Sequence, residues 1–219
     1  MNKNYQLQDK FLESFFTSKF APDFYLTGGT ALTRFYFHHR ESVDLDLFTN
    51  NSGVDFNELN LTAVKISQNL ALNLIKQVIT KDFLQYIWKD KYRTLLKVDF
   101  VKDIPQHFGE NKREGTLSID SLENIGSNKI LAIFGRTDWK DFIDLYFILT
   151  KTKFSFDHLF ELAKQKDLGL SETFLAYSLA EIENARLWPK IFVKLDQKTL
   201  ISFFKPLSRN LFKRIKPKK

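Results

Sequence analysis

The sequence predicts an α+β fold in which a mixed sheet with flanking helices is followed by a helical C-terminal region. Two observations carry this prediction. Strand-like runs are confined to the residues before about 120, whereas from residue 127 onward apolar side chains recur with helical spacing. Runs of strands followed by runs of helices are typical of α+β proteins. We therefore expect an α/β core over residues 1–120 and a helical region over residues 121–219.

The N-terminal half begins with an amphipathic pattern over residues 9–19, which predicts a helix. Residues 24–37 then predict a strand, a double-glycine turn and a second helix. Acidic and apolar side chains alternate over residues 44–48, which is the period of a half-buried strand, and Asp55 is placed to cap a helix that runs to about residue 70. Three strands joined by short turns are expected at residues 72–80, 83–88 and 94–101. A polar loop is expected to follow over residues 103–116.

The C-terminal half reads as a series of amphipathic helices. Its aromatic side chains, such as Phe142 and Phe147, recur at helical spacing and are expected in the core rather than at a ligand. His38 and His39 lack the spacing of metal ligands, so we expect them to pack or to form an ion pair. The predicted helices cover residues 129–134, 140–149, 156–166, 171–186 and 199–215.

Composition excludes several classes of protein. The 219 residues contain no cysteine, which excludes disulfide scaffolds, zinc–thiolate sites and thiol nucleophiles. The first eleven residues are polar where a signal peptide needs an apolar run, and no stretch approaches the roughly 18 apolar residues of a membrane span. We therefore expect a cytoplasmic protein with no membrane partner.

Positive charge is concentrated at the C-terminus. The last fifteen residues hold seven of the 33 Lys and Arg side chains and no acidic residue, so they account for the formal net charge of +7. Such a tail suits an electrostatic contact with a polyanion such as RNA. The alternative is a solvated tail that only increases solubility.

Three acidic residues are candidates for a metal site. Asp44 and Asp46 lie two apart in a predicted strand, so both carboxylates project from one face, and Asp99 lies in a second predicted strand. Adjacent carboxylates repel unless a cation lies between them, and hard divalent cations such as Mg²⁺ prefer oxygen ligands. The alternative is a solvent-facing strand edge with an unrelated Asp99.

The segment before these acids could bind an anion. Gly28 and Gly29 lie between a strand and a helix, where glycine allows the backbone to approach a ligand and the first N–H groups of the helix are free. Thr30 follows them, and Ser42 adds a hydroxyl close to the acidic pair. Arg40 either contributes a cation to the same site or neutralises Asp44; the sequence does not separate these two roles.

The segment YLTGGTAL…HHRESVDLDLF resembles the nucleotidyltransferase superfamily that includes DNA polymerase beta. Within that superfamily it is similar to the AbiE-type toxins of type IV abortive-infection toxin–antitoxin systems, in which a GGTAL-like turn precedes HR-x-S-x-DLDLF. The segment NKILAIFGRTDWKDFIDLYFIL, residues 128–149, resembles a second conserved block of the same toxins. The resemblance covers these two blocks and the strand that carries Asp99.

The resemblance implies a nucleotidyltransferase-type sheet and a role for each matching residue. It implies Asp44, Asp46 and Asp99 as catalytic metal ligands. Nucleotide contacts are implied, or suggested by position, for Gly28, Gly29, Thr30, Arg40, Ser42, Lys129 and Lys140. Asp141 would be a further catalytic acid, in a K-D-x-x-D element that ends at Asp144. The structural alternative for this block is a buried helix pair in which Lys140 and Asp144 form an ordinary i, i+4 ion pair.

The predicted function is therefore a magnesium-dependent nucleotidyltransferase. It would pass a nucleotidyl group from an NTP to a hydroxyl on RNA such as tRNA, on protein or on a small molecule, as the toxin of a pair whose antitoxin is encoded nearby. Two alternatives remain open at this point. One is a metal-dependent phosphatase with a D-x-D motif, and the other is a non-catalytic module that binds NTP or RNA.

Overall fold

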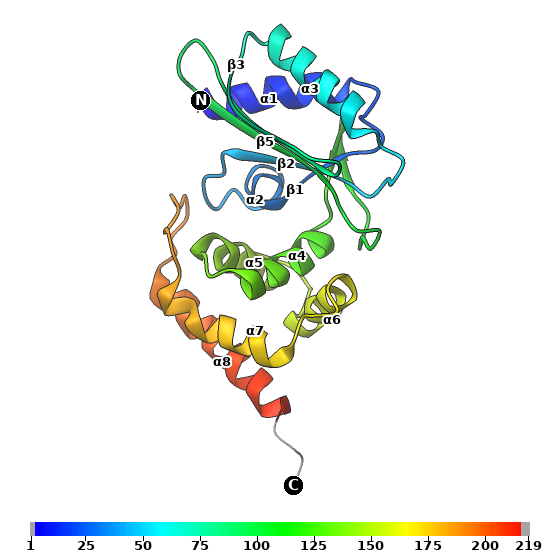
Figure 1. Ribbon diagram of the computed structural model, residues 1–219. Coiled ribbons are helices and arrows are strands. Elements are labelled where there is room, and N and C mark those ends of the chain that lie inside the picture. The colour runs from blue at the N-terminus through cyan, green and yellow to red at the C-terminus, as the bar shows by residue number, and fades with distance from the viewer. Residues whose placement is uncertain (1–2, 216–219) are drawn as a thin grey trace. The chain divides into compact units, whose positions relative to one another are not determined.

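A computed structural model describes residues 3–215, and the chain forms two compact units (Figure 1). The first unit contains the residues up to Tyr36 together with Ser42–Ser121. The second unit contains Phe37–Glu41 and the residues from Leu122 onward. A five-residue segment of the N-terminal half therefore belongs to the helical unit.

Within the described residues, the first unit is built on one seven-stranded sheet with the order β3-β4-β5-β2-β1-β7-β6. Strand β2 pairs in parallel with β5, and β1 pairs in parallel with β7, while the remaining pairs are antiparallel. The sheet is therefore mixed, as predicted. Its strands are β1 (Tyr25–Thr27), β2 (Asp44–Thr49), β3 (Asn73–Ile79), β4 (Phe83–Lys89), β5 (Leu95–Lys102), β6 (Lys112–Glu114) and β7 (Leu117–Ile119).

Helices α1 (Lys3–Phe16) and α3 (Phe56–Asn69) cover one face of this sheet, and α2 (Gly28–Ala31) lies on the opposite face (Figure 1). The rings of Phe15 on α1 and Phe100 on β5 are 5.2 Å apart at their centroids, in a core from which water is excluded. Such aromatic burial is a major source of stability. One face of β2 and β5 is therefore apolar, and the alternate side chains point to the other face.

The second unit is helical. Its core includes Phe142 and Phe204, whose rings meet edge to face with centroids 5.2 Å apart. Phe142 and Phe147 are both buried, which confirms that they are core residues. The elements are α4 (Leu122–Gly135), α5 (Trp139–Lys151), α6 (Phe156–Lys166), α7 (Glu172–Ala180), the 3-10 turn η2 (Glu181–Asn184) and α8 (Gln197–Ile215). None of the helices in residues 3–215 is long and apolar enough to cross a membrane.

The structure corrects three local predictions. The expected loop over residues 103–116 contains β6, a short strand that is fully exposed and so shows no burial alternation. Helix α4 begins at Leu122, before the predicted start at residue 129. The double glycine does not form a separate turn, because helix α2 begins at Gly28 itself and continues into the π-helical turn η1 (Leu32–Tyr36).

Candidate active site

The three predicted acidic residues lie on two adjacent strands of the first unit. Strand β2 carries Asp44 and Asp46, and its parallel neighbour β5 carries Asp99. In the register of this pair, Asp46 lies opposite Asp99 and Asp44 lies opposite Lys97. Leu45, which alternates with the two acids of β2, is buried. The acids therefore share the face of the sheet that α1 and α3 leave uncovered.

Gly28 allows α2 to approach this acidic face. Its φ of +67° lies in the left-handed region that favours glycine. A Cβ atom at this position would lie 2.6 Å from Oδ2 of Asp46, closer than two such atoms can pack. Only glycine therefore lets the Asp46 carboxylate lie against the first turn of α2.

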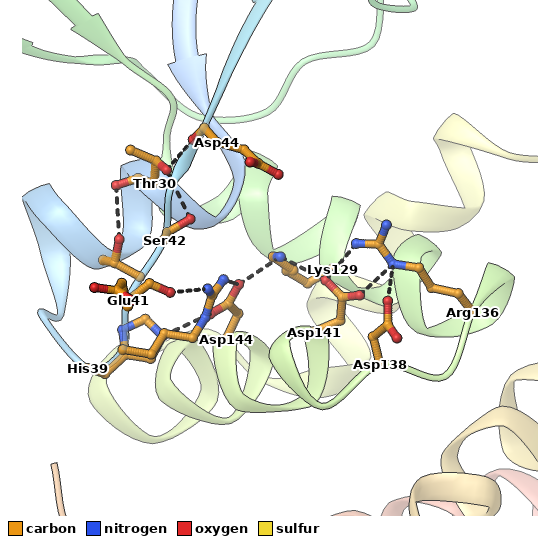
Figure 2. Close-up of polar contacts among 12 residues, drawn as sticks. Thr30, His39, Glu41, Ser42, Asp44, Lys129, Arg136, Asp138, Asp141 and Asp144 are labelled. Carbon is orange, nitrogen blue, oxygen red and sulfur yellow. Dashed lines mark hydrogen bonds and ion pairs between the residues drawn. The ribbon is translucent and has the colours of Figure 1, made fainter. Parts of the chain in front are cut away.

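The Thr30 side chain ties α2 to the start of β2 (Figure 2). Its hydroxyl donates to the backbone carbonyl of Asp44 and shares a hydrogen bond of 2.9 Å with the Ser42 hydroxyl. Thr30 and Gly29 are both buried. The predicted residues Gly28, Gly29, Thr30 and Ser42 thus lie together with the acidic pair.

Lys97 is a member of this site that the sequence analysis missed. Its Nζ lies 3.1 Å from Oδ2 of Asp44 and 3.1 Å from Oδ2 of Asp99. Burial alone would lower the pKa of Lys97, but the charges of these two carboxylates outweigh burial and raise it. The signal was present in the sequence, because Lys97 and Asp99 lie two apart in a strand and so share one face.

The acids have the chemistry of a divalent-cation site. All of their donors are carboxylate oxygens, which hard cations prefer. Oδ1 of Asp99 is buried and has no hydrogen-bond partner, so it keeps its lone pairs available. Within residues 3–215, no group of three or more acidic or histidine side chains lies close enough together to hold a metal ion. The carboxylate donors suit magnesium chemically, and a magnesium ion would have to take the place that the Lys97 ammonium group occupies between Asp44 and Asp99.

A second cluster of predicted residues lies within the helical unit, around Asp144 on α5 (Figure 2). The Arg40 guanidinium donates to both carboxylate oxygens of Asp144 at 2.7 Å, and Lys129 Nζ lies 2.7 Å from Oδ2 of Asp144. Asp144 is completely buried, and Arg40 is 4% exposed. Of the two roles that the sequence leaves open for Arg40, neutralising Asp44 is not observed in the part of the chain that the structure describes, because the guanidinium pairs with Asp144.

Lys129 extends this network to Asp141. Its Nζ lies 2.9 Å from Oδ1 of Asp141, and Arg136 Nε donates to the other oxygen at 2.7 Å. Burial alone would raise the pKa of both carboxyl groups, but the cations outweigh it: Arg40 and Lys129 lower the pKa of Asp144 well below its ordinary value, and Lys129 and Arg136 lower that of Asp141. Both acids are therefore ionised in the folded protein at neutral pH.

His39 completes the surroundings of Asp144. Its Nε2 lies 2.8 Å from Oδ1 of Asp144, and its Nδ1 is buried without a partner. Burial lowers the pKa of His39, and the charges of Arg40 and Lys129 lower it further against the opposing effect of Asp144. The imidazole is therefore neutral at pH 7 and donates Nε2–H to the carboxylate. The prediction that His39 packs or forms an ion pair is confirmed.

The remaining predicted cations lie elsewhere. Lys140 on α5 is half-buried, and within the described residues it forms no ion pair with Asp144, so the i, i+4 pair given as the structural alternative does not form. The basic residues Lys205, Arg209, Lys213 and Arg214 lie on α8. Lys205 pairs with Glu183 at 2.9 Å and Arg214 with Asp157 at 2.7 Å, whereas Arg209 and Lys213 are exposed. The basic residues Lys216, Lys218 and Lys219 lie outside the described residues.

Comparisons with known proteins identify the fold. The chain is 28% identical over 193 residues to an uncharacterized protein of Aquifex aeolicus, strain VF5, covering 85% of this chain and 86% of that protein. A protein from H. pylori that is provisionally assigned as a nucleotidyltransferase superposes with a TM-score of 0.64 at 18% identity, covering 98% and 97% of the two chains.

The nucleotidyltransferase toxin MenT4 from Mycobacterium tuberculosis H37Rv superposes with a TM-score of 0.60 at 10% identity, covering 94% and 82%. At such low identity these two likenesses concern the fold, and they confirm the predicted nucleotidyltransferase type. A family model gives the more specific result, because it matches residues 10–192, most of the chain. The chain therefore belongs to the AbiEii family of nucleotidyl transferase toxins from type IV toxin–antitoxin systems.

Proposed function

We propose that this nucleotidyltransferase uses magnesium to pass a nucleotidyl group from an NTP to a hydroxyl acceptor on RNA, with release of pyrophosphate. The observation that carries the proposal is the grouping of Asp44, Asp46 and Asp99 on two adjacent strands, against the first turn of α2. Such a grouping supplies only oxygen ligands beside the free N–H groups of a helix start. This grouping within one unit supports a site for a metal-bound triphosphate.

Asp44, Asp46 and Asp99 would hold the magnesium. When bound, magnesium at such a site favours ionisation of the attacking hydroxyl and stabilises the charge that develops on the departing pyrophosphate. The open Oδ1 of Asp99 supports its assignment as a ligand. Gly28 leaves the space that the Asp46 carboxylate occupies beside the first turn of α2, which supports Asp46 as a ligand close to the nucleotide phosphates.

We assign the nucleotide phosphates to the segment around α2. The first N–H groups of a helix lack intrahelical acceptors and favour anions, which supports contacts from Gly28, Gly29 and Thr30. Ser42 is fixed by its hydrogen bond to Thr30 and would add a hydroxyl donor. These contacts would orient the triphosphate without help from a flexible side chain.

The helical unit supplies the remaining candidates: Arg40, Lys129 and Asp141 from its buried cluster, and Lys140 from α5 outside that cluster. We assign Arg40, Lys129 and Lys140 to the nucleotide, and Asp141 as a fourth catalytic acid. Burying charged side chains is costly, so their presence in apolar helices calls for a reason, and the family resemblance of this block supports a catalytic one. A structural role in joining Phe37–Glu41 to α5 accounts for the same contacts, so substitutions must separate the two roles.

Exposed Arg209 and Lys213, together with the basic end of the chain, favour RNA, including tRNA, as the acceptor. Family membership also supports a partner antitoxin encoded beside the gene, and we propose a cytoplasmic protein. Neighbouring genes and cell fractionation test these two points directly.

The reaction is tested by offering each of the four NTPs, labelled in turn at the α- or the γ-phosphate, with magnesium and total RNA. Nucleotidyl transfer moves the α label into RNA and releases the γ label as pyrophosphate. A phosphatase would release labelled inorganic phosphate and leave RNA unlabelled. A binding module would return every NTP unchanged.

A further inference from the structure

Lys97 is the residue of the acidic face to which the proposed reaction gives no role. It lies opposite Asp44 in the β2–β5 register and two residues before Asp99 on the same strand. Its ammonium group bridges Oδ2 of Asp44 and Oδ2 of Asp99, both at 3.1 Å. The Lys97 side chain is 31% exposed, so it is neither fixed in the core nor free in solvent.

The bridge reduces the electrostatic repulsion between the two carboxylates. Carboxylates on neighbouring strands repel one another when no cation lies between them. Lys97 supplies that cation from within the chain. It engages only Oδ2 of Asp99 and leaves the buried Oδ1 without a partner, so one ligand atom stays open while the ion pair is intact. A lysine can give up such a position easily, since its compact charge sits on a flexible four-carbon stem.

We propose that Lys97 is the counterion of the metal-free site, and that it transfers to the triphosphate when a divalent cation takes Asp44 and Asp99. This inference rests on the proposed function, because it requires the carboxylates to be the metal ligands. Lys97 would then have two successive partners: the ligand carboxylates before metal binds, and the anionic nucleotide after it. It acts first as a positioning residue and then as a substrate contact.

The proposal predicts effects of opposite sign on the two ligands. Removing the ammonium group removes a competitor and a repelling charge, so the metal should bind more tightly. Removing the same group deletes a charge-assisted contact to phosphate, so the nucleotide should bind more weakly. A salt bridge that merely stabilises the fold predicts no loss of nucleotide affinity once the metal is bound.

The test compares the wild-type protein with Lys97→Met, which keeps the stem and removes the charge. Lys102→Met is the matched control, because Lys102 lies on the same strand and pairs with Asp82 at 2.7 Å. Mn²⁺ binding is titrated without nucleotide, and a non-hydrolysable NTP analogue is then titrated at saturating Mg²⁺. We expect Lys97→Met to bind Mn²⁺ roughly five- to tenfold more tightly and the analogue about tenfold more weakly. The control should change neither affinity.

Melting temperature gives a readout that does not depend on either titration. In EDTA, Lys97→Met should melt below the wild type because Asp44 and Asp99 repel, and Mn²⁺ should raise its melting temperature more than that of the wild type. Lys97→Gln replaces the Met variant if that variant does not fold. An equal metal-induced shift in both proteins would overturn the counterion role.

Asp46→Asn separates failure of this inference from failure of the proposed function. If the wild type fails to bind Mn²⁺, or if Asp46→Asn binds it equally well, the metal site and the role of Lys97 are both wrong. If such binding exists and Lys97→Met binds Mn²⁺ no more tightly, the counterion role alone is wrong. Tighter metal binding with unchanged analogue affinity would overturn the transfer to phosphate.

Discussion

At the residue scale, the contact between Gly28 and Asp46 sets the shape of the acidic face. Two conditions exclude any other residue at position 28: the positive φ and the 2.6 Å separation that a Cβ would have from the carboxylate. From its place between a strand and a helix, the double glycine is expected to bind phosphate. The structure adds a second reason for the first glycine, since it makes room for a candidate metal ligand.

Gly28→Ala should therefore harm both stability and activity. The left-handed conformation costs a residue with a Cβ about 1–2 kcal/mol, and the displaced Asp46 should lower turnover by about a hundredfold. Gly135→Ala is the control, because a Cβ there meets nothing within 4 Å and alanine favours a helix. Urea unfolding and transfer rates measured on both variants check the prediction. Equal effects at the two positions would contradict it.

Substitutions of Lys129 and Lys140 should affect stability differently, although both residues are assigned to the nucleotide. Lys129 pairs with Asp141 and Asp144, so Lys129→Met leaves two buried carboxylates short of a cation and should cost about 3–5 kcal/mol of unfolding free energy. Lys140→Met breaks no ion pair with Asp144 and should leave stability nearly unchanged. Thermal melts of the two variants provide the comparison, and an unaltered melt for Lys129→Met would refute the buried network.

Activity measured below the melting temperature then separates catalysis from structure. If the two lysines face the triphosphate, each Met variant should lose roughly ten- to a hundredfold in nucleotide affinity or turnover while folded. Asp141→Asn should likewise depress turnover in folded protein. Kinetically silent variants would confine the site to the first unit.

At the scale of elements, the segment Phe37–Glu41 joins the helical unit through side-chain contacts with α5 and through backbone hydrogen bonds with residues 190–192. Its Phe37 and His39 rings pack against Phe147, with the His39 ring 4.5 Å from Phe147 at the centroids. The Arg40 guanidinium forms the charged contact to Asp144. Because this segment directly precedes Ser42 and β2, its attachment is covalently linked to the start of the acidic strand.

The neutral state of His39 predicts a pH dependence for this attachment. The pKa of His39 is lowered in the folded protein, whereas in the unfolded chain it is about 6.5, so the unfolded state binds the proton first. Stability should therefore fall as pH drops below about 6.5, by up to about 1.4 kcal/mol at pH 5.5. Asp141 and Asp144 have lowered pKa values and lose their contribution only in stronger acid, so they do not affect this window.

Urea unfolding at pH 7.5 and 5.5 checks this prediction. His39→Gln should show a smaller pH dependence than the wild type, because it keeps an amide donor for Asp144 and cannot titrate. An identical dependence in the two proteins would contradict the assignment of a neutral His39.

Elements with a strong local signal were predictable from sequence. The alternation of β2 is reproduced over Asp44–Thr49, the Asp55 side chain accepts from the backbone of Asn57 at the start of α3, and α6 has the predicted bounds. Strand β6 has no such signal, because all three of its side chains are exposed. Contacts between distant residues, such as Arg40 with Asp144, depend on the tertiary fold, and no local pattern encodes them.

At the scale of the whole molecule, the basic C-terminal segment is partly a structural element. Helix α8 contributes Ser208 and Leu211 to the core, and the Ser208 hydroxyl donates to the carbonyl of Ala176 on α7. Deleting the chain after Leu207 would remove this packing together with the charge. Truncation therefore cannot isolate an RNA contact, and single charge substitutions are the better test.

Arg209→Gln combined with Lys213→Gln should weaken RNA binding and flatten its salt dependence. Each phosphate contact contributes roughly 0.7–0.9 to the slope of log affinity against log salt, so the slope should fall by about 1.4–1.8. Lys151→Gln with Lys153→Gln is the control, since it removes the same charge from other exposed sites of the helical unit. Equal slopes for the two double variants would mean that Arg209 and Lys213 make no specific contact with RNA and only increase solubility.

The central claim is that the carboxylates of β2 and β5 drive magnesium-dependent nucleotidyl transfer. The most direct measurement is the incorporation of α-labelled NTP into RNA by the wild type and by Asp46→Asn, at matched melting temperature and with or without magnesium. We predict incorporation only by the wild type and only with magnesium. Equal incorporation by folded Asp46→Asn, or magnesium-independent incorporation by the wild type, would contradict the account.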